Sequence, residues 1–419
     1  MNFGLERIHR LLDALDRPDE KVKIIHVAGT NGKGSVCAYL ASVLSASGYR
    51  VGRFNSPHLI EPRDSVVIDQ QPVSALDYQQ AMDYVDQLNK DVGASSFECL
   101  VGASLYLFAR HQLDFVVLEV GLGGLLDATN AIRHPVMTII TSIGLDHAAI
   151  LGNTLEAIAI AKAGIMKTGS PVVIAPNLKD VQQTLIDYAT ERGIQYKLAA
   201  SAKWIEPNQL AQLESHRYPI PLLGDYQLEN SATAVTALDW MQKLGHIQFT
   251  ELQLEQGMTK TRWPGRLDWI RSDKYPSLQH KYGLEYLLVD GAHNLPAATA
   301  LRQFIDQHMK GKQILWIMGV TEGKDVTHMI DMLVQPHDRL VAVPFSQPEG
   351  MPWIQCMDPM EIVKTAAPTT APSAVSSLQE GLQTINQWIQ QGPSDDAYAV
   401  VLCGSLYLVA DLYRLIGGV

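Results

Sequence analysis

Short runs of almost continuously apolar residues recur through the first half of the chain. Four of them stand out: Lys23–Ala28, Phe115–Val120, Val136–Ile143 and Pro171–Ala175. A strand with one solvent-facing side would alternate apolar and polar residues, whereas a strand buried on both faces does not. The pattern therefore predicts parallel strands that are covered on both faces.

Segments with helical spacing separate these runs. After the first run, Val36, Leu40, Val43 and Leu44 follow one another at intervals of one, three or four residues, which places them on one side of a helix. Strands that alternate with helices predict an α/β fold with a doubly wound, mostly parallel sheet. The helices expected in this half cover residues 5–16, Ser35–Ser47, 76–90, Leu100–His111, Thr154–Met166 and 226–244.

A proline and a glycine interrupt the pattern at Trp263–Arg266, after which the alternation starts again. We expect a large α/β domain at 1–265, a smaller Rossmann-like α/β domain at 266–419 and a hinge near 263–285. The proline-rich stretch Pro348–Pro372 is expected to be loop for much of its length. The second domain should contain strands at Tyr286–Asp290, Gln313–Met318, Arg339–Val343 and Ala397–Cys403, and helices near 296–310, 325–334, 374–391 and 405–416.

Composition narrows the class of protein. The chain has 419 residues, of which 47% are apolar, and a formal net charge of −11. An acidic chain argues against a nucleic-acid binder, which would carry a basic stripe. The four cysteines form no C-x-x-C pair, and there is neither a signal-peptide pattern nor an apolar run of 18 residues. We expect a cytoplasmic protein with reduced thiols, away from membranes.

The segment Gly29–Ser35 joins the first buried run to the first helical segment and reads Gly-Thr-Asn-Gly-Lys-Gly-Ser. Its glycines allow backbone N–H groups to turn toward phosphate oxygens, and the following helix adds its positive end. Lys33 would reach the β- and γ-phosphates, and Ser35 would lie near a metal. A glycine-rich turn with a surface lysine is the alternative, but the strand and helix on either side favour a phosphate-binding loop.

Ionisable residues stand at the ends of two buried strands. Glu119 lies near the end of one apolar run, and Asp146 and His147 follow another. Ligands of open α/β sheets bind at the carboxyl ends of the strands, so both positions suit a divalent metal beside the phosphates. A capping or salt-bridged glutamate and an ordinary loop histidine are the alternatives if each stands alone.

Lys162 is a lone lysine on an otherwise apolar helical segment. Burial would lower its pKa and make the amine nucleophilic, so that it could take up CO₂ as a carbamate. Composition alone favours a lysine that extends its ammonium group to solvent. Asp290–Asn294, Asp-Gly-Ala-His-Asn, follows the first strand of the second domain and is either a crevice motif or an ordinary turn.

Together these motifs resemble one family, the folylpolyglutamate synthase/dihydrofolate synthase branch of the Mur ligases. Their order along the chain is the order in the family. The segments are His26–Ser35, Ser56–Leu59, Glu119–Gly124 with Leu126–Asn130, Gly144–His147, Ala161–Ile165, Pro264–Arg266 and Asp290–Asn294.

The resemblance implies a ligase that uses ATP to phosphorylate a carboxylate of a pterin substrate. The amine of L-glutamate would then attack the acyl phosphate and give an amide, ADP and phosphate. Dihydropteroate would yield dihydrofolate, and a reduced folate would yield a longer polyglutamate. The resemblance also implies two Mg²⁺ ions that neutralise phosphoryl charge, a carbamylated lysine, and small-molecule partners only; we expect a monomer.

The resemblance also implies roles for individual residues. The catalytic residues would be Lys33, Lys162, His147 and Glu119. The metal ligands would be Ser56, Glu119, His147 and Lys162 as its carbamate. The nucleotide contacts would be Thr30, Asn31, Gly32, Lys33, Gly34, Ser35, Asn230, Arg266, Asp290 and His293. The pterin-side contacts would be Ser95, Ser96, Phe97, Glu98, Leu126, Asp127 and Ala128.

The chain departs from the family pattern near these sites. The family has Glu-Arg where Asp64 and Ser65 stand, Arg at Leu125, Glu at Ala161 and Pro at Leu295. Lost charges leave substrate orientation and lysine activation open. Two other hypotheses follow: a Mur-type ligase with a UDP-muramoyl acceptor, which the Leu126–Asn130 segment disfavours, and a degenerate regulatory protein that binds ATP without ligation.

Overall fold

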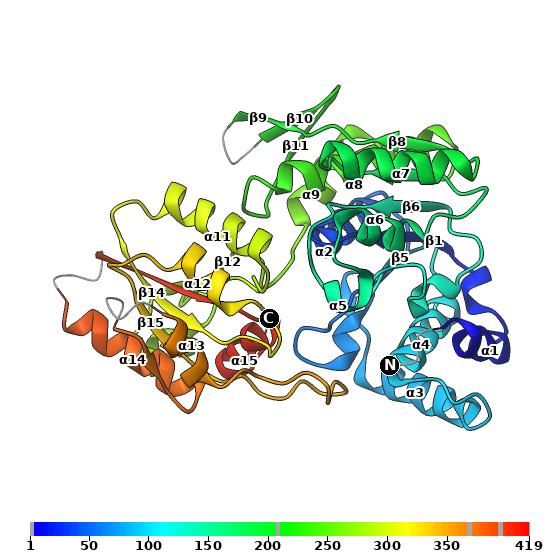
Figure 1. Ribbon diagram of the computed structural model, residues 1–419. Coiled ribbons are helices and arrows are strands. Elements are labelled where there is room, and N and C mark those ends of the chain that lie inside the picture. Colours follow the sequence, from blue (N-terminus) through cyan, green and yellow to red (C-terminus); the bar gives the residue numbers. More distant parts are fainter. Residues whose placement is uncertain (1–3, 207–209, 367–370, 393–396, 419) are drawn as a thin grey trace. The chain divides into compact units, whose positions relative to one another are not determined.

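The computed structural model describes residues 4–206, 210–366, 371–392 and 397–418. The chain divides into two compact units. Unit 1 comprises Met1–His58, Arg63–Pro221 and Tyr226–Arg262, and unit 2 comprises Leu59–Pro62, Leu222–Asp225 and Trp263–Val419. Each unit is built around its own sheet (Figure 1).

Unit 1 contains an eight-stranded sheet in the order β4-β3-β2-β5-β1-β6-β7-β8. The six strands from β2 to β8 pair in parallel, and β3 and β4 extend the β2 edge in antiparallel fashion. The central strands are buried on both faces, as continuous apolar runs require. The strands are β1 (Lys23–Ala28), β2 (Val51–Phe54), β3 (Val66–Ile68), β4 (Gln71–Pro72), β5 (Phe115–Glu119), β6 (Met137–Ile140), β7 (Val172–Ile174) and β8 (Tyr196–Leu198).

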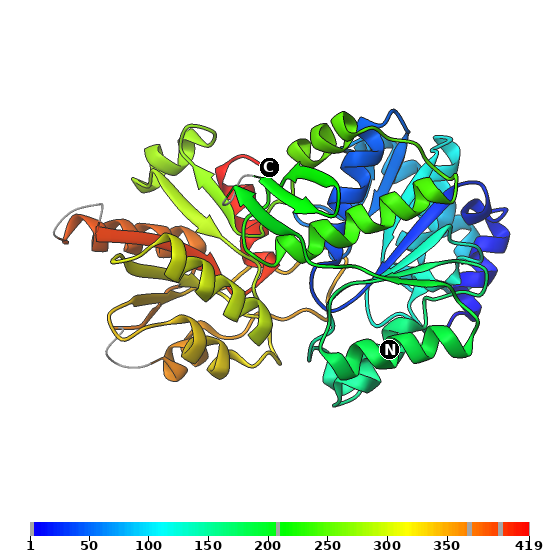
Figure 2. The same ribbon diagram turned by 90° about the horizontal axis from the view of Figure 1, so that it is seen from above.

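Helices cover both faces of this sheet (Figure 2). On one face, the buried side chains of Ile24 and Leu118 pack with α1, α3 and α4, and those of Ala28 and Ile140 pack with α6 and α7. On the other face, α2 packs with α8 and α9. The helices are α1 (Glu6–Ala14), α2 (Lys33–Ala46), α3 (Ala75–Asn89), α4 (Ser96–Arg110), α5 (Ala148–Leu151), α6 (Leu155–Ala163), α7 (Lys179–Glu191), α8 (Gln227–Lys243) and α9 (Glu251–Lys260).

Smaller elements complete unit 1. An antiparallel sheet in the order β11-β10-β9 precedes α8. Three short 3₁₀ turns also occur, and the last of them contains Ala128, one of the predicted site residues. These elements are β9 (Lys203–Glu206), β10 (Leu210–Leu213), β11 (His216–Pro219), η1 (Pro18–Glu20), η2 (Pro62–Ser65, partly in unit 2) and η3 (Ala128–Ala131).

Unit 2 contains a six-stranded sheet in the order β12-β13-β17-β14-β15-β16. Only the β12–β13 pair is antiparallel among these described strands. One apolar core joins the sheet to α10, α14 and α15. The elements are β12 (Asp268–Arg271), α10 (Pro276–Tyr282), β13 (Tyr286–Val289), α11 (Leu295–His308), β14 (Gln313–Met318), α12 (Val326–Leu333), β15 (Arg339–Ala342), α13 (Pro359–Thr365), β16 (Ser373–Ala374), α14 (Leu378–Gln390), β17 (Tyr398–Cys403) and α15 (Leu406–Ile416).

The α/β class and the parallel sheet expected from the sequence are confirmed. The structure adds detail to several element predictions. The range 263–285, where a hinge is expected, contains β12 and α10, whose Ile270 and Leu278 are buried in the core of unit 2. Within Pro348–Pro372, α13 is helical, and residues 367–370 lie outside the described chain. The helix expected from 374 begins only at Leu378, because Ser373 and Ala374 pair with β15.

No described helix is both long and apolar enough to cross a membrane.

Candidate active site

The phosphate-loop segment leaves β1 at Ala28 and enters α2 at Lys33. Gly32 has a φ of +87°, and a Cβ placed there would lie 2.3 Å from Asn230 Oδ1. Only glycine fits both the left-handed backbone and the close side chain. The first backbone N–H groups of α2 have no acceptor within the helix and carry its positive end. The loop can therefore hold an anion.

The segment after β6 braces this loop. Thr30 donates its N–H to the carbonyl oxygen of Ser142 at 2.8 Å and its hydroxyl to that of Gly144 at 3.1 Å. The carbonyl of Asn31 accepts from the Thr141 hydroxyl at 2.8 Å. These bonds fix the loop without using the amides at the start of α2.

Lys33 lies between the loop and the end of β5. Its Nζ donates to the carbonyl oxygen of Thr30 at 3.2 Å and lies 3.8 Å from Glu119 Oε1. Glu119 is only 5% exposed, and its Oε2 accepts from Asn55 Nδ2 at 2.6 Å. The structure thus brings together the lysine and the carboxylate that the sequence predicted separately, with the ammonium group beside the loop.

Ser56 follows Asn55, after β2, the strand next to β5 in the sheet. Its Oγ is buried and has no hydrogen-bond partner in the part of the chain that the structure describes. A buried hydroxyl oxygen without a partner is a suitable ligand for a divalent cation. The residues present therefore fit a metal, with the Ser56 hydroxyl and the carboxylate of Glu119, which is bonded to the adjacent Asn55, as candidate ligands.

The side chain of His147 is more exposed than that of Glu119. Its side chain is 46% exposed, its φ is +53°, and its Nε2 lies 3.9 Å from Asp146 Oδ1. Within the described residues, no group of three His, Cys, Asp or Glu side chains is arranged to hold a metal ion. Any metal centre here must therefore draw on other ligands, such as a serine hydroxyl.

Lys162 lies in the last turn of α6 and is only 5% exposed. Its Nζ donates to the carbonyl oxygen of Gly29 at 2.7 Å. Burial, and then the positive charge of Lys33, lower the pKa of Lys162 to about 7. The alternative that its ammonium group reaches solvent is wrong: the amine is buried against the loop, and burial favours its uncharged form.

Asn230 and Gln227 of α8 lie against the other side of the loop. Asn230 donates to Gln227 Oε1 at 3.2 Å, and Gln227 donates to the Ser35 hydroxyl at 3.2 Å. Ser35 is therefore already tied to α8, while Gly32 is in contact with Asn230. The predicted nucleotide contacts of unit 1 form one continuous group.

The segments predicted on the pterin side lie at the start of α4 and in the loop after β5. Ser95 caps α4, and Glu98 completes a capping box and pairs with Arg7 at 3.1 Å. The ring of Phe97 lies against Gly121, where an added Cβ would be 2.6 Å from its Cζ. Asp127 is buried, and burial raises the pKa of its carboxyl. The remaining predicted residues differ in exposure: Ser96 begins α4, Leu126 is exposed and Ala128 is buried.

In unit 2, Asp290 and Arg266 lie close together. Asp290 is buried, accepts the N–H of Leu267 at 2.8 Å, and has a pKa raised by burial and lowered in part by Arg266. The Arg266 guanidinium lies where a Cβ of Gly291 would stand. His293 Nδ1 lies 2.8 Å from the carbonyl oxygen of Gly291. These three predicted residues form one compact group.

Two protein-family models match the chain. The model for the Mur ligase middle domain matches residues 27–238, and the model for the dihydrofolate synthetase C-terminal domain matches residues 276–415. A probable dihydrofolate synthetase of Schizosaccharomyces pombe is 36% identical over 99% of this chain and 98% of its own length. The dihydrofolate synthetase of Saccharomyces cerevisiae is 33% identical over the same shares. The chain belongs to the dihydrofolate synthase/folylpolyglutamate synthase family.

Solved structures of this ligase family agree. A Mycobacterium tuberculosis folylpolyglutamate synthase complexed with ADP and AMPPCP superposes with a TM-score of 0.85 and 26% identity, over 99% of this chain and 95% of that one. A bifunctional folylpolyglutamate synthase/dihydrofolate synthase with Mn, AMPPNP and L-glutamate bound superposes with a TM-score of 0.82 and 29% identity, over 99% and 94%. The resemblance inferred from the motifs is confirmed, and the chain is an ATP-dependent ligase.

The departures from the ligase-family pattern have definite surroundings. Leu125, which replaces an arginine, is 48% exposed, and its N–H donates to the carbonyl oxygen of Ala161 at 2.8 Å. Ser65, which also replaces an arginine, is buried, and its Oγ has no partner among the described residues. Leu295 is the first residue of α11 and is 43% exposed. The positively charged side chains of the family pattern are thus absent at residues 65 and 125, whereas Leu295 differs from the pattern without a change of charge.

Three polar residues of the site were not predicted from the sequence: Asn55, Thr141 and Gln227. Each donates a hydrogen bond to a predicted residue of another element: Asn55 to Glu119, Thr141 to Asn31 and Gln227 to Ser35. Asn55 precedes the Ser56–Leu59 motif and Thr141 follows a buried strand, so their place at strand ends was the available signal. Gln227 had no local signal beyond its nearness to Asn230.

Proposed function

We propose that this ligase joins L-glutamate to dihydropteroate and gives dihydrofolate. The observation that supports it most is the position of Lys33, held 3.8 Å from Glu119 at the mouth of the phosphate loop. The acceptor is proposed from two relatives that match over almost their full length, a probable dihydrofolate synthetase at 36% identity and a dihydrofolate synthetase at 33% identity. Location in the cytoplasm and a monomeric state are part of the same proposal.

The chemistry begins with an unreactive carboxylate. Transfer of the γ-phosphoryl group of ATP to that carboxylate creates an acyl phosphate with a good leaving group, and the glutamate amine then displaces phosphate. Lys33 and the first amides of α2 hold the charge that shifts during phosphoryl transfer. Thr30, Asn31, Gly32, Gly34, Ser35 and Asn230 would orient the nucleotide in unit 1, and Arg266, Asp290 and His293 are proposed nucleotide contacts of unit 2.

Divalent metal would be held by Ser56, Glu119 and His147. The buried, unpartnered oxygen of Ser56 and the carboxylate of Glu119 support these two ligands. Such ions supply positive charge beside the phosphoryl oxygens. A second ion is proposed near Lys162, whose uncharged amine would attack CO₂ and release one proton to solvent, which gives an anionic carbamate. The pKa near 7 supports this, because the uncharged amine is the reactive form.

The acceptor would lie on the side of Ser95, Ser96, Phe97, Glu98, Leu126, Asp127 and Ala128. Phe97 supports this assignment because its ring borders the turn at Gly121, close to the Asp127 carboxylate. A flat aromatic ring and a carboxylate together suit the ring system and donor groups of a pterin.

The proposal is tested by phosphate release from purified protein with ATP and Mg²⁺. Phosphate should appear only when dihydropteroate and L-glutamate are both present, together with dihydrofolate in equal amount. Nucleotide binding without any ligation would instead support a degenerate regulatory protein. A UDP-muramoyl acceptor is the negative control, since turnover with it would place the chain in another branch of the Mur ligases.

A second candidate function is the extension of reduced folates to polyglutamates. Its support is the 30% identity to the bifunctional Bacillus subtilis dihydrofolate synthase/folylpolyglutamate synthase, over 98% of this chain and 94% of that one. A panel that compares dihydropteroate with tetrahydrofolate under the same conditions separates the two functions.

The carbamate is tested by Lys162→Ala. We expect turnover to fall by about 100-fold or more, because one charge beside the phosphoryl group is lost, and formate or acetate to restore part of it by supplying a carboxylate. Lys33→Ala is the matched control, since it lacks a cation and should gain nothing from added carboxylates. Loss of activity at residue 162 without any rescue would leave the lysine with a purely structural function.

A further inference from the structure

His26 begins a fully buried hydrogen-bond chain that ends in the loop after β5. It lies in β1, and its side chain shares a face with Ile24 and Ala28, because alternate strand residues point the same way. His26 Nε2 lies 2.9 Å from Thr129 Oγ1, and Thr129 Oγ1 lies 2.6 Å from Asp127 Oδ1. None of the assigned site roles includes His26 or Thr129.

The geometry fixes the direction of each hydrogen bond. Asp127 can only accept when ionised, so the Thr129 hydroxyl donates to it. The hydroxyl proton is then used, and Thr129 Oγ1 can only accept from His26. The imidazole must therefore carry its proton on Nε2. Its Nδ1 is buried and has no hydrogen-bond partner among the described residues, which agrees with an unprotonated nitrogen.

Asp127 links two turns of the same loop. It accepts the N–H of Leu122 at 2.7 Å and the N–H of Thr129 at 3.0 Å. Leu122 belongs to the turn that follows Glu119, and Thr129 belongs to η3. The orientation of this carboxylate therefore sets how the two turns face each other, next to Phe97.

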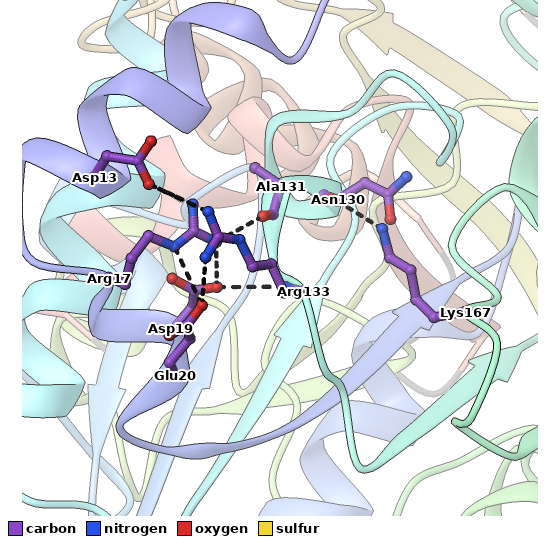
Figure 3. Close-up of polar contacts among 8 residues, drawn as sticks. All are labelled: Asp13, Arg17, Asp19, Glu20, Asn130, Ala131, Arg133 and Lys167. Atoms are coloured by element: carbon purple, nitrogen blue, oxygen red, sulfur yellow. Dashed lines mark hydrogen bonds and ion pairs between the residues drawn. The ribbon is translucent and has the colours of Figure 1, made fainter.

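Other elements hold the backbone of η3 but not the Thr129 hydroxyl. Figure 3 shows Lys167 donating to the carbonyl oxygen of Asn130 at 3.0 Å and Arg17 donating to that of Ala131 at 3.1 Å. Arg17 is itself held by Asp19 at 2.6 Å. Because these contacts reach only carbonyl oxygens, the rotation of the hydroxyl is left to His26 and Asp127.

We propose that His26 is a positioning residue for the acceptor, which acts through Thr129 on Asp127. This inference rests on the proposed function, in which Asp127 borders the pterin. A histidine that served packing alone would have no reason to align one nitrogen with Thr129 while burying the other without a partner. An imidazole with a single proton on Nε2 instead holds the hydroxyl, and with it the carboxylate, in one orientation.

The test compares kinetic constants of four full-length single variants and one double variant. His26→Leu removes the donor, His26→Gln keeps an N–H donor, and Thr129→Val removes the hydroxyl. Thr138→Val is the matched control, since it removes a fully buried hydroxyl from the neighbouring β6 that takes no part in the chain. The KM for dihydropteroate, the KM for ATP and kcat are measured for each, along with the midpoint of thermal unfolding.

We expect His26→Leu and Thr129→Val each to raise the KM for dihydropteroate by about tenfold, the size of one buried hydrogen bond. The KM for ATP should stay within about twofold. His26→Gln should return the KM for dihydropteroate to within about threefold of the starting value. The KM for dihydropteroate of the double variant His26→Leu/Thr129→Val should be no higher than that of the more impaired single variant. Both substitutions break the same hydrogen-bond chain, so their effects should not add.

Three results would overturn the inference. They are an equal rise in the KM for ATP, equal damage from His26→Gln and His26→Leu, or a lower unfolding midpoint with unchanged kinetic constants, as expected of Thr138→Val. Failure of the unsubstituted protein to turn over dihydropteroate would instead reject the proposed function.

A spectroscopic measurement does not depend on any variant folding. In ¹⁵N-histidine-labelled protein at pH 7.5, the His26 ring should show a proton on Nε2 and a bare Nδ1. A proton on Nδ1, or a doubly protonated ring, contradicts the hydrogen-bond direction and overturns the inference.

Discussion

At the scale of single residues, Lys33 has a defined location beside the phosphate loop. Its ammonium group lies between the carbonyl oxygen of Thr30 and the carboxylate of Glu119, at 3.2 and 3.8 Å. Its side chain is 17% exposed, so the ammonium group is in part open to solvent. On the proposed function, a bound phosphate would be a third partner of the same group.

Lys33→Ala should reduce kcat by about 10²–10³-fold or more, because it removes a positive charge from the transferring phosphoryl group. The unfolding midpoint should change little. Steady-state kinetics with saturating ATP, dihydropteroate and glutamate give the measurement. Lys21→Ala is the control, since it breaks only an exposed pair with Asp16; a near-normal kcat for Lys33→Ala would refute the catalytic assignment.

Residue chemistry was predictable where a residue type and a strand end coincide. Glu119 and Lys33 were found in this way, and they are in contact. Lys162 was not predictable from composition, because only the fold shows that the last turn of α6 faces the carbonyl of Gly29. His26 looks like part of an apolar run in the sequence; its hydrogen bond with Thr129 spans 103 residues and has no local signal.

At the scale of elements, the turn from β1 into α2 depends on Gly32. An alanine there would meet both a φ of +87° and the side chain of Asn230. Gly32→Ala should lower the free energy of unfolding by more than the ~1–2 kcal/mol of left-handed strain alone and should raise the KM for ATP at least about tenfold. Chemical denaturation and ATP-dependent kinetics measure the two effects.

Gly48 provides a matched control for this turn. Its φ is +88°, but an added Cβ would have no heavy atom within 4 Å. Gly48→Ala should show the strain without any change in the KM for ATP. If Gly32→Ala and Gly48→Ala had the same KM for ATP, the contact between residue 32 and Asn230 would not contribute to ATP binding.

The start of α4 offers a second prediction. Ser95 accepts the N–H of Glu98 and donates its own N–H to that side chain at 2.7 Å. Ser95→Ala should lower the free energy of unfolding by about 1 kcal/mol, the usual loss of an N-cap, and should also raise the KM for dihydropteroate, because Ser95 is a proposed acceptor contact. Thr250→Ala removes the same kind of capping box from α9 and should lose the same stability without a change in that KM. Equal KM values for the two variants would contradict the proposed contact between Ser95 and the acceptor.

Elements were predictable in proportion to their burial. The strands β1, β5, β14 and β17 are fully or almost fully buried and were confirmed from continuous apolar runs. The edge strands β4 and β8 were missed, because segments of two and three residues are too short to show a period. The helix α7 was missed although it is regular, since charged and polar residues make up most of its exposed surface.

At the scale of the whole molecule, the proposed nucleotide contacts are divided between two units that have separate cores. The phosphate loop, Glu119 and Lys162 all lie in unit 1, whereas Arg266 and Asp290 lie in unit 2. We expect calorimetry to resolve two transitions, because each unit buries its own apolar surface. Mg²⁺ with ADP at 100 times its Kd should stabilise the unit that binds it by ~2.7 kcal/mol.

Two variants assign the calorimetric transitions to the units. Lys33→Ala should abolish most of the nucleotide-induced rise in the midpoint temperature of the unit 1 transition. Arg266→Ala should reduce only a nucleotide-induced rise in the midpoint of the unit 2 transition. A single transition that moves as one with nucleotide would show that the two units unfold together.

The bond between Lys162 and the carbonyl of Gly29 has a consequence for how the enzyme responds to its surroundings. On the proposed mechanism, the amine must leave that carbonyl and meet dissolved CO₂ before the site is complete. With a pKa of about 7, more of the amine is uncharged on the alkaline side of neutrality, and less on the acid side. Freshly prepared protein in degassed buffer would therefore have a low initial rate of ligation, and added bicarbonate would raise that rate. The rate of folate synthesis would then depend on how much CO₂ the solution has taken up from air.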